Sequence, residues 1–273
     1  MTAGMTAESL MQAAAEVARL AGDNALRHYK SALAVERKGD GSEVTVADRE
    51  SEQLARAWIE QRFADDGILG EEFGEVRPRA RRRWVLDPID GTKTFVRGVP
   101  LWGTLVGVIE GDDVVAGAIH IPALGELVAA GRGCGAWYNG ARCRTSEVDD
   151  LSRATVSTTD QRYPNDAGRR ARWEALARRA LVAQTWGDCY GYVLVATGRI
   201  EAMVDDRMNP WDAAALLPVI TEAGGRFTSW AGVETAFGGD AIATNEALGA
   251  IVREALGAGA EAAGFGRRVA RDR

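Results

Sequence analysis

The sequence predicts an α+β fold in which helices are layered on sheets, and three observations support this. The N-terminus carries a long amphipathic pattern, the middle a series of short apolar runs, and the second half alternates apolar runs with helical patterns. The chain has 273 residues, of which 46% are hydrophobic. That is enough to bury a substantial core, in one large domain or in two halves that share an interface.

Two helices are expected in the first part of the chain. Residues 7–30 form the first, because apolar residues recur there at helical spacing: Leu10, Ala13, Val17, Leu20, Ala21 and Leu26. A short exposed strand and turn follow over 34–40. The second helix begins at Thr45 or Ala47 and ends at Phe63, with Asp48 in its first turn and with Leu54, Trp58 and Ile59 on one side.

Strands are expected next, because short apolar runs there are separated by turn residues. They cover residues 84–86, 104–110, 114–121 and 126–130, and the glycine-rich stretch 131–140 is expected to be mainly turns. A boundary between halves is expected near 146–151. This divides the chain into an N-terminal α+β half (1–148), which carries the metal-binding motif, and a C-terminal α/β half (149–256), which closes the active site.

The second half is expected to alternate strands with helices. Strands are predicted at 154–157, 181–185 and 200–204, and helices at 168–180, 189–197 and 211–223. Residues 257–273 are rich in Gly, Ala and Arg and lack apolar periodicity, so they are expected to be a disordered tail.

Composition excludes several classes of function. The formal net charge of −6 offers no electrostatic footprint for nucleic acid and no basic surface for anionic lipid. The three cysteines form no CxxC pair, which argues against a zinc ribbon and against a disulfide framework. No signal peptide and no apolar stretch of membrane-spanning length is present, so a cytoplasmic protein without membrane or nucleic-acid partners is expected.

The sharpest motif is the hexapeptide Asp87-Pro88-Ile89-Asp90-Gly91-Thr92. Pro88 fixes its own φ and favours extended geometry at Asp87, so the chain leaves the strand abruptly. Asp87 and Asp90 can then turn into one pocket with the Ile89 carbonyl, and these are the hard oxygen ligands that Mg²⁺ prefers. The Gly91 and Thr92 amides could hold phosphate oxygens, especially if a helix begins there. The alternative is an Asp-rich turn in which Asp90 caps a helix.

Three further acids are candidates for the same pocket. Glu71 follows a short apolar step bounded by glycines and could be a metal ligand, although adjacent glutamates such as Glu71 and Glu72 are usually solvated. Asp212 and Asp48 each lie in the first turn of a predicted helix, where a carboxylate commonly serves as a cap. Their functional alternatives are a further metal ligand for Asp212 and, for Asp48, a partner of the Thr92 hydroxyl in activating water. Several acids in one pocket would repel one another without bound cations.

Nucleophilic mechanisms find little support. The two histidines, His28 and His120, have no Ser or Cys setting typical of a triad, and the chain has neither a Walker-type loop nor a GxGxxG motif before a helix. Direct attack by metal-activated water is therefore the most economical mechanism.

Three motifs in this order resemble those of the inositol monophosphatase family: Gly70-Glu71-Glu72, the run from Trp84 to Thr92, and Trp211-Asp212 followed by Glu222-Ala223-Gly224-Gly225. The resemblance covers about residues 8–255. It implies a layered αβαβα sandwich, usually a homodimer. It also implies Mg²⁺-dependent hydrolysis of a small phosphate monoester with two or three ions.

The resemblance also implies roles for individual residues. Glu71, Asp87 and the Ile89 carbonyl resemble the ligands of a first metal, and Asp87, Asp90 and Asp212 those of a second. Thr92 paired with Asp48 resembles the water-activating couple, with Glu71 as a further catalytic carboxylate. The amides of Gly91 and Thr92 would hold the phosphate, and Asp212 would also border the substrate.

Finer details are similar to the histidinol-phosphatase branch of the family, in residues 90–100 and 186–192. Asp188 stands where inositol phosphatases usually have a small polar loop, and an added carboxylate suits the ammonium and imidazole of histidinol phosphate. Asp205 occupies the region where the family contacts the leaving alcohol. Thr94 departs from the Asn that this branch usually has, which changes little because both residues are small and polar.

The expected function is therefore histidinol-phosphate phosphatase in histidine biosynthesis. An inositol-1-phosphate or broader sugar-phosphate phosphatase is the alternative on the same scaffold. A metal-stabilised regulatory binding protein is the non-enzymatic alternative, and the complete set of acids together with Thr92 argues against it.

Overall fold

The computed structural model describes residues 5–32, 34–39, 41–163 and 166–257, so the predicted tail after Gly257 lies outside the described residues. The helices are α1 (Ala7–His28), α2 (Val46–Arg62), α3 (Thr92–Val96), α4 (Ala167–Ala177), α5 (Asp188–Ala196), α6 (Pro210–Ala213), α7 (Leu216–Glu222) and α8 (Gly249–Ala255). None of the helices within the described ranges combines the length and apolar character needed to span a membrane.

The strands form two large sheets and one small hairpin. The hairpin pairs β1 (Glu36–Arg37) with β2 (Glu43–Val44). The first sheet has the order β10-β9-β8-β7-β6-β5-β3-β4, and the second the order β12-β11-β13-β15-β14. The first sheet contains β3 (Gly67–Gly70), β4 (Gly74–Val76), β5 (Arg82–Asp90), β6 (Gly103–Glu110), β7 (Asp113–Ile121), β8 (Glu126–Gly131), β9 (Gly135–Tyr138) and β10 (Ala141–Arg142). The second contains β11 (Thr155–Ser157), β12 (Val182–Gln184), β13 (Ala202–Asp205), β14 (Gly225–Thr228) and β15 (Ala241–Asn245).

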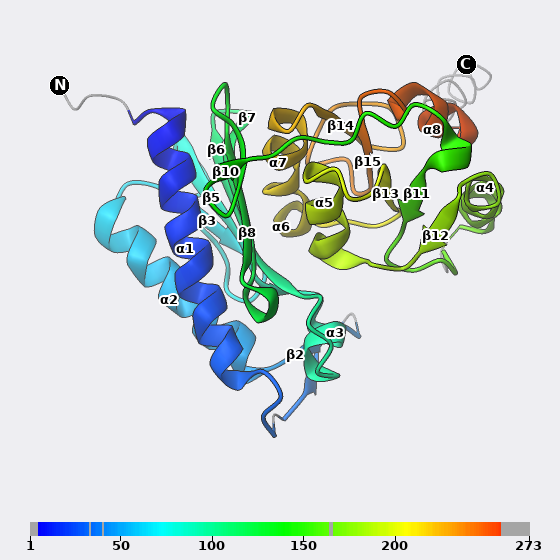
Figure 1. The fold of residues 1–273 in the computed structure, drawn as a ribbon. Helices are drawn as coiled ribbons and strands as arrows, with labels where there is room; N and C mark the ends of the chain where they lie inside the picture. The colour runs from blue at the N-terminus through cyan, green and yellow to red at the C-terminus, as the bar shows by residue number, and fades with distance from the viewer. Residues whose placement is uncertain (1–4, 33, 40, 164–165, 258–273) are drawn as a thin grey trace, which may run out of the picture.

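Five layers follow one another through the molecule. In Figure 1, α1 and α2 lie side by side against one face of the eight-stranded sheet, and α5, α6 and α7 lie between the two sheets. The five-stranded sheet comes next, and α4 and α8 cover its far side. This arrangement confirms the predicted α+β fold and its αβαβα layering.

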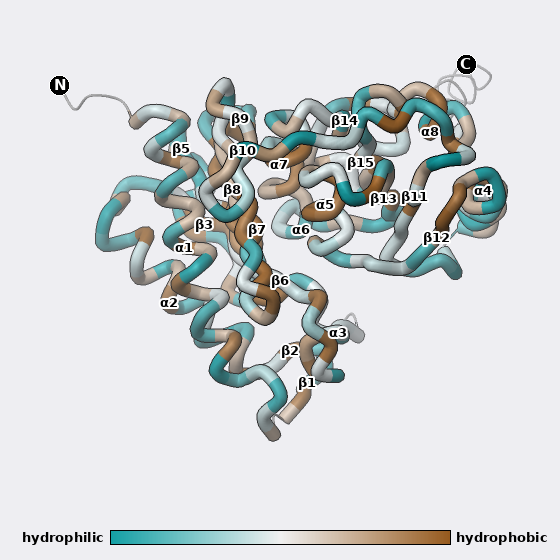
Figure 2. Tube along the Cα trace, in the orientation of Figure 1, coloured by the Kyte–Doolittle hydropathy of each residue, from teal (hydrophilic) through white to brown (hydrophobic). Residues whose placement is uncertain are grey.

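Apolar packing explains why the layers hold together. The largest core cluster lies between the sheets and joins Leu105 and Ile119 of the first sheet to Val193, Leu216 and Phe227 of the second half. A second cluster fills the space between α1, α2 and the outer face of the eight-stranded sheet. Figure 2 shows the same pattern, with apolar colour along the central strands and on α5 and α7.

Two glycines let the middle helices lie close to the eight-stranded sheet. Gly107 of β6 and Gly117 of β7 are direct partners across the strands. A Cβ at Gly107 would lie 2.7 Å from the Ala214 Cβ, and one at Gly117 would lie 2.4 Å from the Ala215 carbonyl oxygen. Real Cβ atoms do not approach so closely, so both positions require glycine here. This contact sets the position of α6, which carries Asp212.

The structure corrects several expected elements. The single helix predicted over 211–223 is divided into α6 and α7, because Pro218 has no N–H to donate to the Ala214 carbonyl. The stretch predicted as turns contains β9, which pairs with β8. On the two N-terminal helices, Leu20 and Leu54 are 37% and 39% exposed rather than part of the apolar face.

Candidate active site

A bulge in β5 places Asp87 and Asp90 together. Residues three apart on a regular strand face opposite sides of the sheet. Here Asp87 pairs with Leu105 while Asp90 pairs with Gly103, so the register against β6 shifts by one residue between them. The bulge contains Pro88 and Ile89. It turns the carboxylates of Asp87 and Asp90 toward the same side of the sheet. The Ile89 amide donates to Asp87 Oδ1 at 3.0 Å, which fixes the orientation of that carboxylate.

Asp212 reaches the same place from the second half of the chain. It is the third residue of α6, where the Asn209 amide donates to its Oδ2 at 2.7 Å and completes a capping box. Carboxylate oxygens of Asp87, Asp90 and Asp212 all lie within 4.8 Å of one another. Asp212 therefore serves the helix cap and belongs to the acidic cluster at the same time.

The cluster is electrostatically unfavourable without a cation. Burial, followed by repulsion from Glu71, Asp90 and Asp212, raises the pKa of Asp87 well above its usual value. Burial, followed by repulsion from Asp188 and Asp212, does the same to the pKa of Asp90. Within the described residues, no Lys or Arg forms an ion pair with any of the three clustered aspartates. A divalent cation would relieve this repulsion.

Glu71 lies at the edge of the cluster rather than in it. It comes directly after β3, which runs parallel to β5, so both strands end at the same edge of the sheet. Its carboxylate forms an ion pair with Lys38 at 2.8 Å, and Lys38 also contacts Glu72 at 2.6 Å. Glu71 and Asp212 line one cavity of about 470 Å³. The structure thus places Glu71 beside the predicted ligands, with its charge balanced by a lysine that the sequence did not single out.

The Thr92 hydroxyl lies between two oxygens of the site. It is 3.0 Å from the Ile89 carbonyl oxygen and 3.4 Å from Asp48 Oδ1. The other carboxylate oxygen of Asp48 accepts hydrogen bonds from the Thr45 amide at 2.8 Å and the Thr45 hydroxyl at 2.7 Å. Asp48 therefore belongs to the capping box of α2, whose N-cap residue is Thr45, and is also the partner of Thr92. Burial raises the pKa of Asp48, while the hydrogen bonds from Thr45 oppose that rise.

Asp188 lies against the glycine of the hexapeptide. Gly91 has a φ of +85°, and a Cβ there would lie 3.0 Å from Asp188 Oδ2. Asp188 itself has a φ of +51°, which is uncommon for a residue with a side chain and is held by the hydrogen bond from its amide to Thr159 Oγ1. The Thr94 hydroxyl donates to its carboxylate at 3.2 Å. The side chain thus lies between the Gly91–Thr94 segment and the aspartates that line the same cavity.

Asp205 ends β13 and is held by two donors. The Thr159 amide donates to its Oδ1 at 2.9 Å, and the Tyr192 hydroxyl donates to its Oδ2 at 2.8 Å. Burial raises the pKa of Asp205 to about 6, although these hydrogen bonds oppose the rise. Asp90, Asp188, Asp205 and Asp212 line one cavity of about 250 Å³.

Two cations stand at the junction of the two cavities. Lys93 and Arg207 line both of them, together with Asp212. Both side chains are exposed. They provide positive charge at the rim of an otherwise acidic site.

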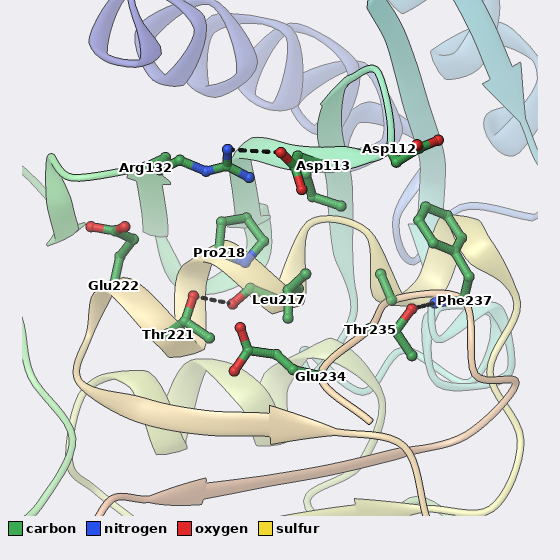
Figure 3. Close-up of a pocket in the computed structure, with 12 residues that line it drawn as sticks. Asp112, Asp113, Arg132, Leu217, Pro218, Thr221, Glu222, Glu234, Thr235 and Phe237 are labelled. Atoms are coloured by element: carbon green, nitrogen blue, oxygen red, sulfur yellow. Dashed lines mark hydrogen bonds and ion pairs between the residues drawn. The ribbon is translucent and has the colours of Figure 1, made fainter. Parts of the chain in front are cut away.

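A third cavity lies away from this cluster, where the end of α7 meets the turns of the eight-stranded sheet (Figure 3). Its volume is about 360 Å³. Asp113 forms an ion pair with Arg132 at 3.1 Å, and Glu222 accepts the amides of Gly133 and Gly135. Glu222, part of the sequence motif after Asp212, therefore joins α7 to the β8–β9 turn and does not reach the acidic cluster.

Sequence reasoning missed several residues of the site. Lys93 and Tyr192 line the site from within the runs 90–100 and 186–192, although no role was predicted for either side chain. Lys38, Thr159 and Arg207 touch or line it without belonging to any motif. Only long-range contacts identify them, and no local spacing marks them. One missed residue, Glu52, does have a signal in the sequence, because it follows Asp48 by one helical turn.

The chain is similar to several known proteins along most of its length. A model of the inositol monophosphatase family matches residues 6–260. The histidinol-phosphatase of Chlorobaculum parvum is 40% identical over 251 residues, which cover 91% of this chain and 97% of that protein. The histidinol-phosphatase of Mycobacterium tuberculosis is 39% identical over 232 residues, covering 83% and 89%. The crystal structure of the extragenic suppressor protein SuhB from Bartonella henselae matches with a TM-score of 0.86 at 28% identity, covering 91% of this chain and 98% of that one.

Proposed function

The chain belongs to the inositol monophosphatase family and is a phosphatase, and from this premise we propose that it is an Mg²⁺-dependent histidinol-phosphate phosphatase. The observation that carries the substrate assignment is Asp188, a carboxylate that lies against Gly91 and shares a cavity with Asp205. Relatives named histidinol-phosphatase, at 36–40% identity, support the same assignment.

The residues present fit Mg²⁺. The donor set consists of carboxylates within 4.8 Å of one another, together with a backbone carbonyl at Ile89, and it contains no thiolate or imidazole. Hard oxygen ligands of this kind suit Mg²⁺ better than a softer metal. Asp87, Asp90 and Asp212 would hold one ion, and Glu71, Asp87 and the Ile89 carbonyl a second. When bound, the ions would supply charge neutralisation for the phosphate and would lower the pKa of a water molecule.

The chain's own residues would position the reacting groups. The Thr92 hydroxyl can accept a hydrogen bond from the attacking water while it donates to Asp48, which directs the water's proton toward a buried carboxylate. The amides of Gly91 and Thr92, at the start of α3, would hold phosphate oxygens. The water oxygen forms a bond to phosphorus as the bond between phosphorus and the ester oxygen breaks, and the leaving alkoxide takes up one proton to become the alcohol.

Substrate recognition would come from the two other acids of the smaller cavity. The ammonium of histidinol phosphate is close to its ester oxygen and therefore to the phosphate. Because the phosphate would be held by the amides of Gly91 and Thr92, the ammonium would lie near Asp188, which contacts Gly91. The imidazole lies further along the molecule, where the cavity is lined by Asp205 and Tyr192. Inositol 1-phosphate offers hydroxyls but no positive charge to either carboxylate, which is why histidinol phosphate is favoured over this alternative.

Turnover of the two substrates at equal Mg²⁺ tests this proposal. We expect kcat/KM for histidinol phosphate to exceed that for inositol 1-phosphate by about tenfold or more, and Asp188→Asn to reduce that ratio by about tenfold. Asp112→Asn, far from the cavity, is the matched control and should leave the ratio unchanged. A higher kcat/KM for inositol 1-phosphate would refute the substrate assignment.

The family resemblance also leads us to propose a homodimer that acts in histidine biosynthesis in the cytoplasm. The division into halves at residues 148 and 149 likewise stays a prediction. The strands of the eight-stranded sheet come from residues 67–142 and those of the five-stranded sheet from 155–245, which is consistent with it.

A further inference from the structure

One face of α2 carries three buried or half-buried polar side chains at successive helical turns: Asp48, Glu52 and Arg56. Residues four apart on a helix lie on the same side, so this is a continuous stripe. Asp48 reaches Thr92, which follows β5. The other two reach the turn that follows β3, where Glu71 lies.

Glu52 is the central member of the stripe, and its side chain is completely buried. Its Oε2 accepts the Glu72 amide at 2.7 Å, and its Oε1 accepts the Phe73 amide at 3.2 Å. The Arg56 Nε donates to the same Oε1 at 2.7 Å. The buried Glu52 carboxylate thus accepts hydrogen bonds from the backbone immediately after Glu71 and from the Arg56 guanidinium.

Arg56 extends the contact to the far end of the turn, because its Nη2 donates to the Gly74 carbonyl. The near end is held by the Glu71 amide, which donates to the Leu86 carbonyl of β5 at 3.2 Å. Gly70 is required by the same arrangement, since a Cβ there would lie 2.0 Å from Glu52 Oε1. The pairing of β3 with β4 closes the turn at Gly70 and Gly74, and the backbone between them is fixed to β5 and to the α2 stripe.

We propose that Glu52, supported by Arg56, is a positioning residue for metal binding: it fixes the turn 70–74 so that Glu71 meets the ligands on β5. The inference rests on the proposed role of Glu71 as a metal ligand. Partners of this kind fix the orientation of ligands, and their loss typically lowers metal affinity about 10- to 100-fold. α2 would thus position both sides of the metal site, through Asp48 on one side and Glu52 on the other.

Magnesium binding to chelator-treated protein, measured by calorimetry, tests the proposal without depending on turnover. In Glu52→Gln only one acceptor oxygen remains, and the new NH₂ group faces an N–H donor. We expect the Kd for Mg²⁺ to rise about tenfold or more. Ile59→Val is the control, since Ile59 is buried on the same helix, in the apolar cluster that joins α1 and α2 to the sheet. It should lower Tm while changing the Kd less than about twofold.

Equal Kd values in Glu52→Gln and Ile59→Val, at a similar loss of Tm, would overturn the proposal. If Glu52→Gln does not fold, Arg56→Lys carries the test. It keeps the positive charge but loses the donor to Gly74, so we expect about a threefold rise in Kd, and an unchanged Kd would refute the proposal. Glu71→Gln distinguishes a failure of the positioning role of Glu52 from a failure of the proposed function. Weaker binding in Glu71→Gln with normal binding in Glu52→Gln would reject the positioning role alone, whereas wild-type protein that binds no Mg²⁺ would reject the proposed function as well.

Discussion

Two cavities of this protein are acidic, but they carry their charge differently. In the cavity of Figure 3, Asp112 and Glu234 are exposed, Asp113 pairs with Arg132, and Glu222 accepts two amides. In the other, Asp90 and Asp212 lie together with Asp87 and have no cationic side chain as an ion-pair partner within the described residues. The difference shows that acidic residues alone do not identify a metal site. Clustered carboxylates that are buried or half-buried, accept backbone amides and have no cationic partner do indicate one.

The largest effect is expected when one aspartate of the cluster is neutralised, because this removes the charge that distinguishes the two cavities. Asp90→Asn removes a charged ligand but keeps its shape and the acceptor for the Cys189 amide. We expect kcat/KM to fall at least about 1,000-fold, or about 4 kcal/mol of transition-state stabilisation, because a direct ligand contributes more than the partners around it. Phosphate release at saturating Mg²⁺ measures this. Activity within about tenfold of wild type would contradict the mechanism.

The pH dependence of stability tests whether burial of a carboxylate such as Asp205 is costly in this cavity. Its pKa is raised to about 6 in the folded protein, against 3.8 in the unfolded chain. The neutral form is therefore favoured by folding, so its contribution is fully present below about pH 4 and is lost as pH rises through 6. The difference between 3.8 and about 6 corresponds to about 3 kcal/mol. Asp205→Asn does not titrate, so its free energy of unfolding should rise relative to wild type by up to that amount between pH 4 and 7.

Chemical denaturation in the presence of a chelator measures this difference. Asp112→Asn is a suitable control, because Asp112 is exposed and its substitution should give a difference that does not change with pH. A pH-independent difference for Asp205→Asn would mean that the buried carboxylate is ionised at no cost.

The smallest effect is expected in the cavity of Figure 3. Asp113→Asn removes a solvent-exposed ion pair with Arg132, and such pairs contribute about 0–1 kcal/mol. We expect the free energy of unfolding to fall by less than about 1 kcal/mol and kcat/KM to stay within about twofold of wild type. A large loss of activity would show that the cavity of Figure 3 takes part in function.

Much of the fold could be predicted from local pattern. α1, α2 and the central strands β6, β7 and β8 follow from periodicity, because each buries one face or a continuous run of apolar residues. β9 and β10 could not be predicted, since their glycine-rich surroundings resemble turns and their pairing depends on β8. The division between α6 and α7 depends on Pro218 and on close contact with two glycines of the sheet.

The site divides in the same way. The hexapeptide predicted Asp87 and Asp90 in one pocket, and the structure brings them together with Asp212. The bulge that brings Asp87 and Asp90 together could not be predicted, because the register shift in β5 is defined only by its pairing with β6. Lys38 and Thr159 contact site residues that lie 33 and 46 positions away in the sequence, so no local motif contains both partners.

Magnesium binding to chelator-treated protein is the most direct test of the central claim, that the clustered aspartates without a cationic partner form the metal site. Calorimetry should show saturable binding to wild type. Asp212→Asn should raise the Kd by at least about tenfold, and Asp113→Asn, in the cavity with compensated charge, should leave it unchanged. Equal Kd values in all three proteins, or no binding to wild type, would contradict the account.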